Sequence, residues 1–351
     1  MNDERERFER AFELFPMPEP PLDRLLRRRD RKRRNQRIAA GVVGVAVIAS
    51  FALAIGIAMR SEPGPADTPT PVVAPNKFAD IHGRIVYRSG SEIMAVDPAN
   101  PQDTIALHEP SLQHDPIGWS PDGTQLLLAD VHLGYAIVDL FVVHADGSRT
   151  DLPSGDGGSF SPDMSMIAYA KGGADGGVYV MDADGGTPRL VAKADSPGPC
   201  GQVAAWSPDG SQIAFTDFQG PYGPTCSDSP PGVSFVNDDG TGLREQLVQL
   251  PWGGASGIAW SPDGSQLVLS MTGYSDGDNP RGRIYVVNAD GSGLRQISSG
   301  GNDRWPAWSP DGTRIAFVRG DQLFTMAPDG TDVQEVVGVS PEGAIAWNPL
   351  R

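Results

Sequence analysis

A five-residue motif, Trp-Ser-Pro-Asp-Gly, recurs along this chain and restricts its fold more than any other feature. Asp-Gly is typical of a tight strand reversal, because glycine tolerates positive φ and aspartate hydrogen-bonds to its own backbone. A variant copy starts at Phe160 and has Met164 in place of the last glycine. The complete copies start at Trp119, Trp206, Trp260 and Trp308. The motif therefore predicts one tight turn in each of several repeated units.

Each copy of the motif is followed by short apolar segments that indicate β-strands. The first is exemplified by residues 213–215 (Ile-Ala-Phe), a second ends in an acidic turn such as residues 141–147, and a third is exemplified by residues 190–192. With the strand that carries the motif tryptophan, each repeat holds four strands. Four strands in roughly 40–50 residues is the size of a β-propeller blade.

A sixth copy of the motif is divided between the two ends of the repeat region. Residues 344–349 read Ala-Ile-Ala-Trp-Asn-Pro, the first half of a copy, and residues 82–87 read His-Gly-Arg-Ile-Val-Tyr, the second half. If they join, the closing blade takes its innermost strand from Trp347 and its outer strands from the segment after Gly83, which leaves no open sheet edge. We therefore predict an all-β, six-bladed β-propeller with split-blade closure over residues 81–351.

An uninterrupted apolar segment, residues 38–59, precedes the repeats and predicts one transmembrane helix. Only Ser50 is polar, and a helix of this length spans roughly 33 Å, enough for a bilayer core of about 30 Å. Lysine and arginine are concentrated in residues 24–37, which predicts a cytoplasmic N-terminus and an extracytoplasmic propeller. A cleaved signal peptide, with a cleavage site at residues 52–54, is the alternative, although both the preceding region and the apolar run exceed the usual lengths.

Two further segments flank this apolar stretch. Residues 1–37 are too few for a packed domain, but residues 8–15 carry apolar side chains at helical spacing, which is compatible with a helix that docks onto a cytoplasmic partner. A disordered tail, or a helix on the membrane surface, is the alternative, and the basic run also suits anionic lipid headgroups. Residues 60–80 are Pro-rich and predict an extended linker.

These repeats resemble the WD40-like PD40 repeats of the TolB β-propeller family, whose signature is the same turn followed by an Ile-Ala-Phe strand. The resemblance covers about residues 83–349 and implies the fold, whereas propellers host binding, scaffolding and catalysis alike. TolB itself carries an N-terminal α/β domain and is soluble in the periplasm. Because an anchor and a linker stand in that place here, its partners in the Tol–Pal system are not carried over.

The composition and the motifs favour a chain without enzymatic activity, metal or cofactor. The formal net charge is −16, and the negative charge lies in the propeller region, which argues against nucleic-acid binding. The repeated aspartates are interpreted as turn residues, and residues 275–279 have too few ligands for a calcium loop. The five histidines include no pair at metal-ligand spacing, and no nucleophile elbow is present.

The two cysteines predict a disulfide. Cys200 lies just before the strand that carries Trp206, and Cys226 lies in the insertion between the second and third strands of the same blade. These two connections emerge on one face of a blade, and the outside of a cell oxidises thiols. We therefore predict a Cys200–Cys226 disulfide that staples the loop 218–231; two unpaired thiols are the alternative.

Ligand binding is expected on that same face, opposite the motif turns. The blades that start at Trp206 and Trp260 have the longest loops there, 216–232 and 270–282. Variable residues on a repeated scaffold are candidates for recognition, and ordinary solvated loop tips are the alternative. The candidates on these loops, or at the channel mouth just ahead of the inner strands, are Asp115, Asp156, Gln202, Tyr222, Tyr274, Asp303, Arg304 and Trp305.

Three functions are compatible with this organisation. The first is a membrane-anchored, non-catalytic sensor or scaffold that binds a protein, peptide or cell-envelope ligand. The second is a transmembrane regulator, because the arrangement resembles membrane-anchored anti-sigma regulators, although their usual helical domain is missing and residues 1–37 would have to signal. The third is a propeller lyase or hydrolase acting on an envelope polymer, for which Asp303 and Arg304 would be the residues to test.

Overall fold

The computed structural model describes residues 78–107, 114–132, 137–172, 175–193, 203–218, 231–250, 254–275, 279–299 and 301–349. The chain divides into two compact units, Met1–Val72 and Val73–Arg351. The first unit lies wholly outside the described residues, and with it the predicted cytoplasmic segment and the predicted membrane helix 38–59. Within the described part of the chain, no helix has the length and hydropathy needed to cross a bilayer.

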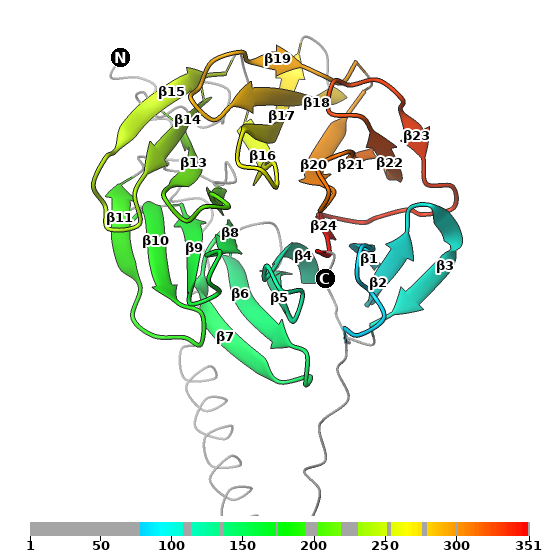
Figure 1. The fold of residues 1–351 in the computed structure, drawn as a ribbon, viewed down its shortest axis with the longest axis horizontal. Coiled ribbons are helices and arrows are strands. Elements are labelled where there is room, and N and C mark those ends of the chain that lie inside the picture. The colour runs from blue at the N-terminus through cyan, green and yellow to red at the C-terminus, as the bar shows by residue number, and fades with distance from the viewer. Residues whose placement is uncertain are drawn as a thin grey trace, which may run out of the picture. The chain divides into compact units, whose positions relative to one another are not determined.

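The second unit consists of six four-stranded antiparallel sheets, which we call blades, arranged around a common axis (Figure 1). From the innermost to the outermost strand, blade 1 is β24 (Ile345–Trp347), β1 (Ile85–Ser89), β2 (Glu92–Asp97) and β3 (Asn100–Ala106); blade 2 is β4 (His114–Trp119), β5 (Gln125–His132), β6 (Ile137–His144) and β7 (Arg149–Ser154); and blade 3 is β8 (Gly157–Phe160), β9 (Met166–Lys171), β10 (Gly177–Asp182) and β11 (Arg189–Lys193).

The remaining three blades follow the same order without a split. Blade 4 is β12 (Ala204–Trp206), β13 (Ile213–Phe218), β14 (Pro231–Val236) and β15 (Arg244–Gln249); blade 5 is β16 (Gly254–Trp260), β17 (Gln266–Ser275), β18 (Asn279–Asn288) and β19 (Arg295–Gln296); and blade 6 is β20 (Asp303–Trp308), β21 (Ile315–Arg319), β22 (Gln322–Met326) and β23 (Gln334–Glu335). The prediction of six blades is confirmed.

The second strand of each blade is apolar on both of its faces because it lies between two neighbouring blades. In β5, Leu126, Leu127 and Leu128 are all fully buried. Leu126 and Leu128 belong to an apolar cluster shared with blade 1, whereas Leu127 belongs to one shared with blade 3. Successive side chains of a strand point to opposite faces. A strand that is packed on both faces therefore becomes a continuous apolar run.

Apolar clusters of this kind fill all six interfaces between neighbouring blades. One of them joins Ile85 of blade 1 to Ala316 and Val318 of blade 6, so the packing continues around the ring. The ring is thus closed by apolar burial as well as by strand pairing, and burial is the dominant favourable term in folding.

The split blade forms as predicted, from the last and the first strands of the unit. β24 pairs antiparallel with β1, with Ile85 opposite Trp347 and Tyr87 opposite Ile345. The indole Nε1 of Trp347 donates to the carbonyl of Gly83 at 2.8 Å, and the backbone N–H of Asn348 donates to the carbonyl of Arg84 at 2.8 Å. These two bonds join the start and the end of the propeller at the point where the other blades have a continuous turn.

The predicted loop over residues 270–282 is wrong. The strands β17 and β18 extend into it and pair without interruption from Gln266–Asn288 to Ser275–Asn279, which leaves only residues 276–278 between them. The second predicted loop is also shortened, because Phe218 pairs with Pro231 in blade 4. Ladder hydrogen bonds satisfy the backbone in both places, and this outweighs the local turn-forming composition.

Candidate functional site

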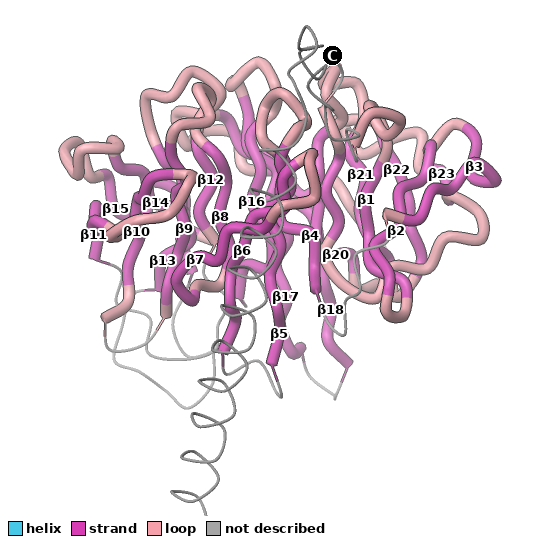
Figure 2. The backbone as a smooth tube through the Cα atoms, turned by 90° about the horizontal axis from the view of Figure 1, so that it is seen from below, coloured by secondary structure: helices cyan, strands magenta, loops and turns pink. Residues whose placement is uncertain are grey.

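The antiparallel blades give the propeller two distinct faces. The turns from the first to the second strand and from the third to the fourth strand lie on one face, which we call the turn face; Figure 2 shows described turns gathered there. The loops from the second to the third strand, and the connections between blades, lie on the opposite face, which we call the loop face. The predicted site residues belong to the loop face, and the repeated motifs belong to the turn face.

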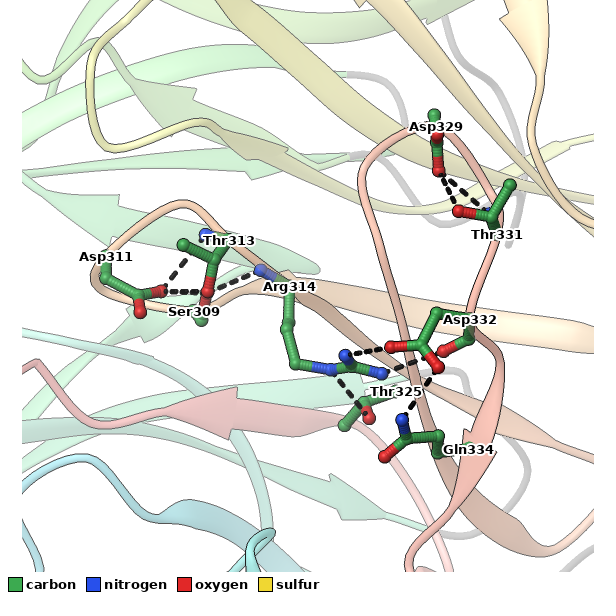
Figure 3. Close-up of polar contacts among 9 residues, drawn as sticks. All are labelled: Ser309, Asp311, Thr313, Arg314, Thr325, Asp329, Thr331, Asp332 and Gln334. Atoms are coloured by element: carbon green, nitrogen blue, oxygen red, sulfur yellow. Dashed lines mark hydrogen bonds and ion pairs between the residues drawn. The ribbon is translucent and has the colours of Figure 1, made fainter.

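On the turn face the motif aspartates serve as structural turn residues, as predicted. In blade 6 the hydroxyl of Ser309 donates to Oδ1 of Asp311 at 2.6 Å, and the backbone N–H of Thr313 donates to the same oxygen at 3.0 Å (Figure 3). The same two bonds recur in the other four motif turns. Such bonds hold the pKa of Asp163, Asp209, Asp263 and Asp311 below its ordinary value, because they favour the ionised form.

Arg314 connects the two turns of blade 6 on this face. Its guanidinium donates to a carboxylate oxygen of Asp332 at 2.7 Å and to the carbonyl of the same residue at 2.8 Å (Figure 3). A third bond, at 3.1 Å, goes to the hydroxyl of Thr325. Within the blade, the turn acids Asp311 and Asp329 are therefore satisfied by serine and threonine, and Arg314 by Asp332 and Thr325.

On the loop face three of the six inner strands, β4, β16 and β20, carry a β-bulge. In β20 the bulge places Trp305 and Pro306 opposite the single residue Phe317. A bulge bends its strand and re-aims side chains, and bulges are common next to binding sites. The inner strands therefore depart from regular pairing towards the mouth of the central channel.

Trp305 is held in an unusual backbone conformation at this bulge. Its φ is +52°, and Asn302, three residues earlier, has a φ of +61°. A bulky residue rarely adopts the left-handed region. The backbone N–H of Trp305 donates to the hydroxyl of Ser270 in blade 5 at 3.3 Å. Strain of this kind persists only where the surrounding structure enforces it, and it is concentrated at functional sites.

Arg304 lies against the indole of Trp305. The guanidinium carbon is 4.5 Å from the ring centroid, which is a cation–π contact. A guanidinium nitrogen of Arg304 also donates to the carbonyl of Gly320 at 3.0 Å. The two side chains together form a partly exposed plate, with a cation and an aromatic face, at the start of β20.

Asp303, the residue before Arg304, is fully buried, with no part of its surface exposed. The guanidinium of Arg319 donates to its two carboxylate oxygens at 2.7 and 3.1 Å. The same guanidinium lies over the rings of Phe317 and Phe324. A bidentate arginine pair is among the strongest polar contacts in proteins. Asp303 therefore fixes the start of β20, the strand that carries Arg304 and Trp305.

Asp115 belongs to a second charged cluster on the loop face. The guanidinium of Arg88 donates to Asp115 at 2.8 Å, to the carboxylate of Glu342 at 2.9 Å and to the carbonyl of Glu342 at 2.6 Å. Burial raises the pKa of Asp115 above its ordinary value, and the hydrogen bond from Arg88 opposes that shift. The cluster joins blade 1, blade 2 and the segment that leads into β24.

The sequence placed the channel-mouth candidates just ahead of the inner strands, which is correct for Asp156 and wrong for four others. Asp115 lies inside β4, and Asp303, Arg304 and Trp305 lie inside β20. Tyr274 lies in β17, where its backbone pairs with that of Pro280 in β18. The other two candidates and both cysteines lie outside the described residues: Gln202, Tyr222, Cys200 and Cys226. The disulfide therefore stays a prediction.

Sequence reasoning missed Arg88 and Glu342. A signal for Arg88 was present, because it occupies the position in its strand where the other blades carry Ala129, Ala170, Thr216, Ser270 and Val318. A charged residue in an otherwise apolar strand indicates a specific partner. No such signal marks Glu342, which is exposed.

The described residues include no group of three or more histidine, cysteine, aspartate or glutamate side chains arranged to hold a metal ion. What the loop face does offer is the aromatic ring of Trp305 and the guanidinium of Arg304, together with the buried carboxylate of Asp303 and the partly buried carboxylate of Asp115. Such a set suits recognition of a polar ligand by stacking and charge.

The ring of six four-stranded blades, closed by a strand from each end of the unit, defines a six-bladed β-propeller. The family model of the TolB β-propeller domain (PD40) matches residues 155–345, more than half of the chain. The chain belongs to this TolB-type PD40 propeller family.

Individual proteins are similar to this chain over parts of their length. The uncharacterized protein Atu1656 of Agrobacterium fabrum is 28% identical over 225 residues, which is 62% of this chain and 69% of that protein. The TolB homologue of Chlorobium luteolum is 31% identical over 146 residues, but this match spans only 28% of the homologue and 40% of this chain.

Among solved structures, TolB from Acinetobacter baumannii is similar in fold. It has a TM-score of 0.57 at 18% identity, and the match covers 77% of this chain and 67% of that protein. A structural similarity at this level of sequence identity shows the fold alone, because a shared fold hosts different functions.

Proposed function

We propose that this propeller is a non-catalytic binding module. It recognises a protein, a peptide or a cell-envelope ligand at the channel mouth on the loop face. The observation that supports this proposal is the bulged start of β20, where Trp305 is held at a φ of +52° with Arg304 stacked on it. Backbone strain at a bulky residue lowers the stability of the fold. A role of Trp305 in ligand recognition explains why this strained conformation is kept.

In this proposal the neighbouring groups position the plate rather than react. Asp303 is fully buried and paired with Arg319, so it orients the start of β20. Asp115, which is partly buried, accepts a hydrogen bond from Arg88 at 2.8 Å and is likewise held in place. In this proposal Trp305 and Arg304 are therefore the residues that contact the ligand. Aromatic residues and arginines of this kind contribute most of the binding energy in protein interfaces.

The proposed location is the extracytoplasmic side of a membrane. It rests on the apolar segment 38–59 and on the basic residues 24–37 that precede it. The predicted linker 60–80 is too long at its end, because Phe78 is buried in the apolar cluster between blades 1 and 2. A propeller tethered in this way would sample envelope components within reach of the segment that precedes Phe78.

Pull-down from solubilised cell envelopes with the full-length chain in detergent tests the binding proposal. We expect a specific envelope component to be retained, and Arg304→Ala to weaken its binding about tenfold, since a central arginine contact is worth more than about 1 kcal/mol. Arg149→Ala is the matched control, because Arg149 also stacks on an aromatic ring, that of Phe141 at 3.6 Å, but on the turn face. Equal loss in both variants, or no retained component, would contradict the proposal.

A further inference from the structure

Asp-Gly pairs recur in the turns of this propeller, and all but one of them have an engaged carboxylate. Within the described residues, four pairs lie in motif turns and five in the second turns, those from the third to the fourth strand. In eight of these nine pairs, a serine or threonine two residues after the aspartate donates to Oδ1 through its backbone N–H and its hydroxyl. The eight aspartates are Asp122, Asp146, Asp209, Asp239, Asp263, Asp290, Asp311 and Asp329. The ninth is Asp184, in the second turn of blade 3.

The second turn of blade 3 lacks the hydrogen bonds that its counterparts share. Gly186 stands where the other turns have serine or threonine. Within the described part of the chain, the exposed carboxylate of Asp184 has no hydrogen bond or ion pair. In blades 2, 4, 5 and 6 a backbone bond of 2.9 Å also closes the second turn, whereas the described residues of blade 3 show no such bond from Asp182 to Gly186. The Asp184 side chain is therefore free to turn towards its own backbone.

The backbone nitrogen that follows Asp184 is also held loosely. The N–H of Gly185 donates to the carbonyl of Asp182 at 3.1 Å, whereas the equivalent bonds of the other second turns measure 2.8–3.0 Å. Gly185 and Gly186 have φ values of +99° and +150°, and glycine has the widest range of backbone conformations. The turn between β10 and β11 can therefore bring this nitrogen against the carboxyl carbon of Asp184.

The hydrogen bonds of the other second turns oppose such an approach in two ways. They hold the carboxylate against the residue two positions later, away from the next nitrogen. They also favour the ionised form, so the bonds from the hydroxyl and the backbone N–H lower the pKa below its ordinary value in Asp146, Asp239, Asp290 and Asp329. Attack on the carboxyl carbon needs the neutral acid, because the oxygen of a carboxylate does not leave. These four turns are therefore protected.

We infer that Asp184 and Gly185 form a site of spontaneous backbone modification, at which Asp184 is converted to isoaspartate. The Gly185 nitrogen bonds to Cγ of the neutral carboxyl, and the carboxyl hydroxyl leaves with the amide proton as water, which closes a succinimide ring. Water then opens the ring. Opening at the α-carbonyl leaves the chain linked through the β-carboxyl, with a free α-carboxylate. One water leaves and one is added, so no other reactant is needed. The inference does not depend on the proposed channel-mouth function.

Ageing the folded full-length chain in heavy-oxygen water at neutral pH tests the inference. Ring opening inserts one heavy oxygen whichever product forms, and digestion in ordinary water followed by mass spectrometry locates it. We expect Asp184 to take up label at least about fivefold faster than Asp290, the factor that corresponds to the loss of one hydrogen bond. Equal uptake at the two aspartates would overturn the inference.

The same labelling in urea separates the fold from the local sequence. All nine pairs have glycine after aspartate, and the turn hydrogen bonds are lost on unfolding, so their uptake should then agree within about twofold. An unchanged lead of Asp184 in urea would assign its reactivity to the local sequence and overturn the inference.

Two variants test the cause within the folded protein. Ser292→Gly gives the second turn of blade 5 the Asp-Gly-Gly sequence at an exposed position. It should raise the uptake at Asp290 at least about threefold, because the hydroxyl donor is lost. Asp184→Glu is the control and should abolish uptake at position 184, since the larger ring closes far more slowly. Unchanged uptake at Asp290 in Ser292→Gly, or continued uptake in Asp184→Glu, would overturn the inference.

Discussion

Aspartate side chains occupy two contrasting environments in this propeller. On the turn face they accept bonds from serine and threonine, which lowers their pKa, as at Asp263 and Asp311. On the loop face Asp115 is partly buried beside Arg88, and burial raises its pKa. The same residue type therefore stabilises turns on one face and anchors cationic side chains on the other.

The turn acids predict how stability depends on pH. The folded-state pKa of Asp263 lies below its ordinary value of 3.8 because Ser261 and Ser265 donate to the carboxylate. The ionised group therefore stabilises the fold above the unfolded-state pKa, and this contribution is lost as pH falls through the lowered folded-state pKa. We expect the urea midpoint to decline below about pH 4, and to decline less steeply in Asp263→Asn.

Asp311→Asn, in the equivalent turn of blade 6, should flatten the pH series in the same way, because Ser309 and Thr313 donate to its carboxylate and lower its pKa. A wild-type slope in Asp263→Asn would show that the turn hydrogen bonds do not couple protonation to folding.

The second turns of the blades also contribute to packing between elements. Gly330 in blade 6 has a φ of +88°, and a Cβ placed there would lie 2.2 Å from the carbonyl oxygen of Ile297, which follows β19 in blade 5. Gly240 approaches the carbonyl of Val191 in the same way, at 3.2 Å. Arg295 adds a bond from blade 5 to the carbonyl of Pro328 at 3.1 Å. Neighbouring blades are therefore held together at their outer strands through the turn backbone.

A matched pair of glycine substitutions separates this contact from the cost of the backbone conformation. Gly147 occupies the equivalent turn of blade 2 at a φ of +82°, with nothing within 4 Å of a Cβ. Gly147→Ala should cost roughly 1–2 kcal/mol of unfolding free energy, from the left-handed backbone alone. Gly330→Ala should cost a further 1–3 kcal/mol or so, because the blades must separate. Urea denaturation measures both, and equal costs would rule out a role for the contact.

The motif spacing predicted the blades and their closure, because a tryptophan strand and an Asp-Gly turn recur with each unit. It did not predict the long β17–β18 ribbon, since Gly273, Gly277 and Pro280 favour turns locally while ladder pairing favours strand. The left-handed Trp305 could not be predicted either, because it opposes the steric preference of its own residue type. The contact between Arg88 and Asp115 joins different blades, and no local spacing encodes it.

At the scale of the whole ring, the closing blade is tied to its neighbours by charge as well as by strand pairing. Arg88 in β1 contacts Asp115 in β4 and Glu342 ahead of β24. The backbone N–H of Glu342 donates back to the carbonyl of Arg88 at 3.0 Å, and that of Gly90 donates to the Glu342 carboxylate at 3.1 Å. The arginine therefore connects the three segments that have to meet before the ring is complete.

Arg88→Ala should lower the urea midpoint and open the closing strand selectively. Losing a partly buried arginine that holds two acids is expected to cost about 2–3 kcal/mol, discounted for the exposure of Glu342. Hydrogen exchange should accelerate at the amides of β24 before it does so in other inner strands. Arg314→Ala is the control, because Arg314 makes a comparable set of bonds inside one blade. Faster exchange of β24 in both variants would argue against a specific role for Arg88.

The split blade also has a consequence for the order of events during synthesis. β1, β2 and β3 leave the ribosome first among the described strands, yet the inner edge of β1 is paired only by β24, the last. Until β24 emerges, the growing chain carries an exposed strand edge, the kind of edge that recruits other chains. Completion of the final strand is therefore the step that converts an aggregation-prone nascent chain into a closed and protected ring.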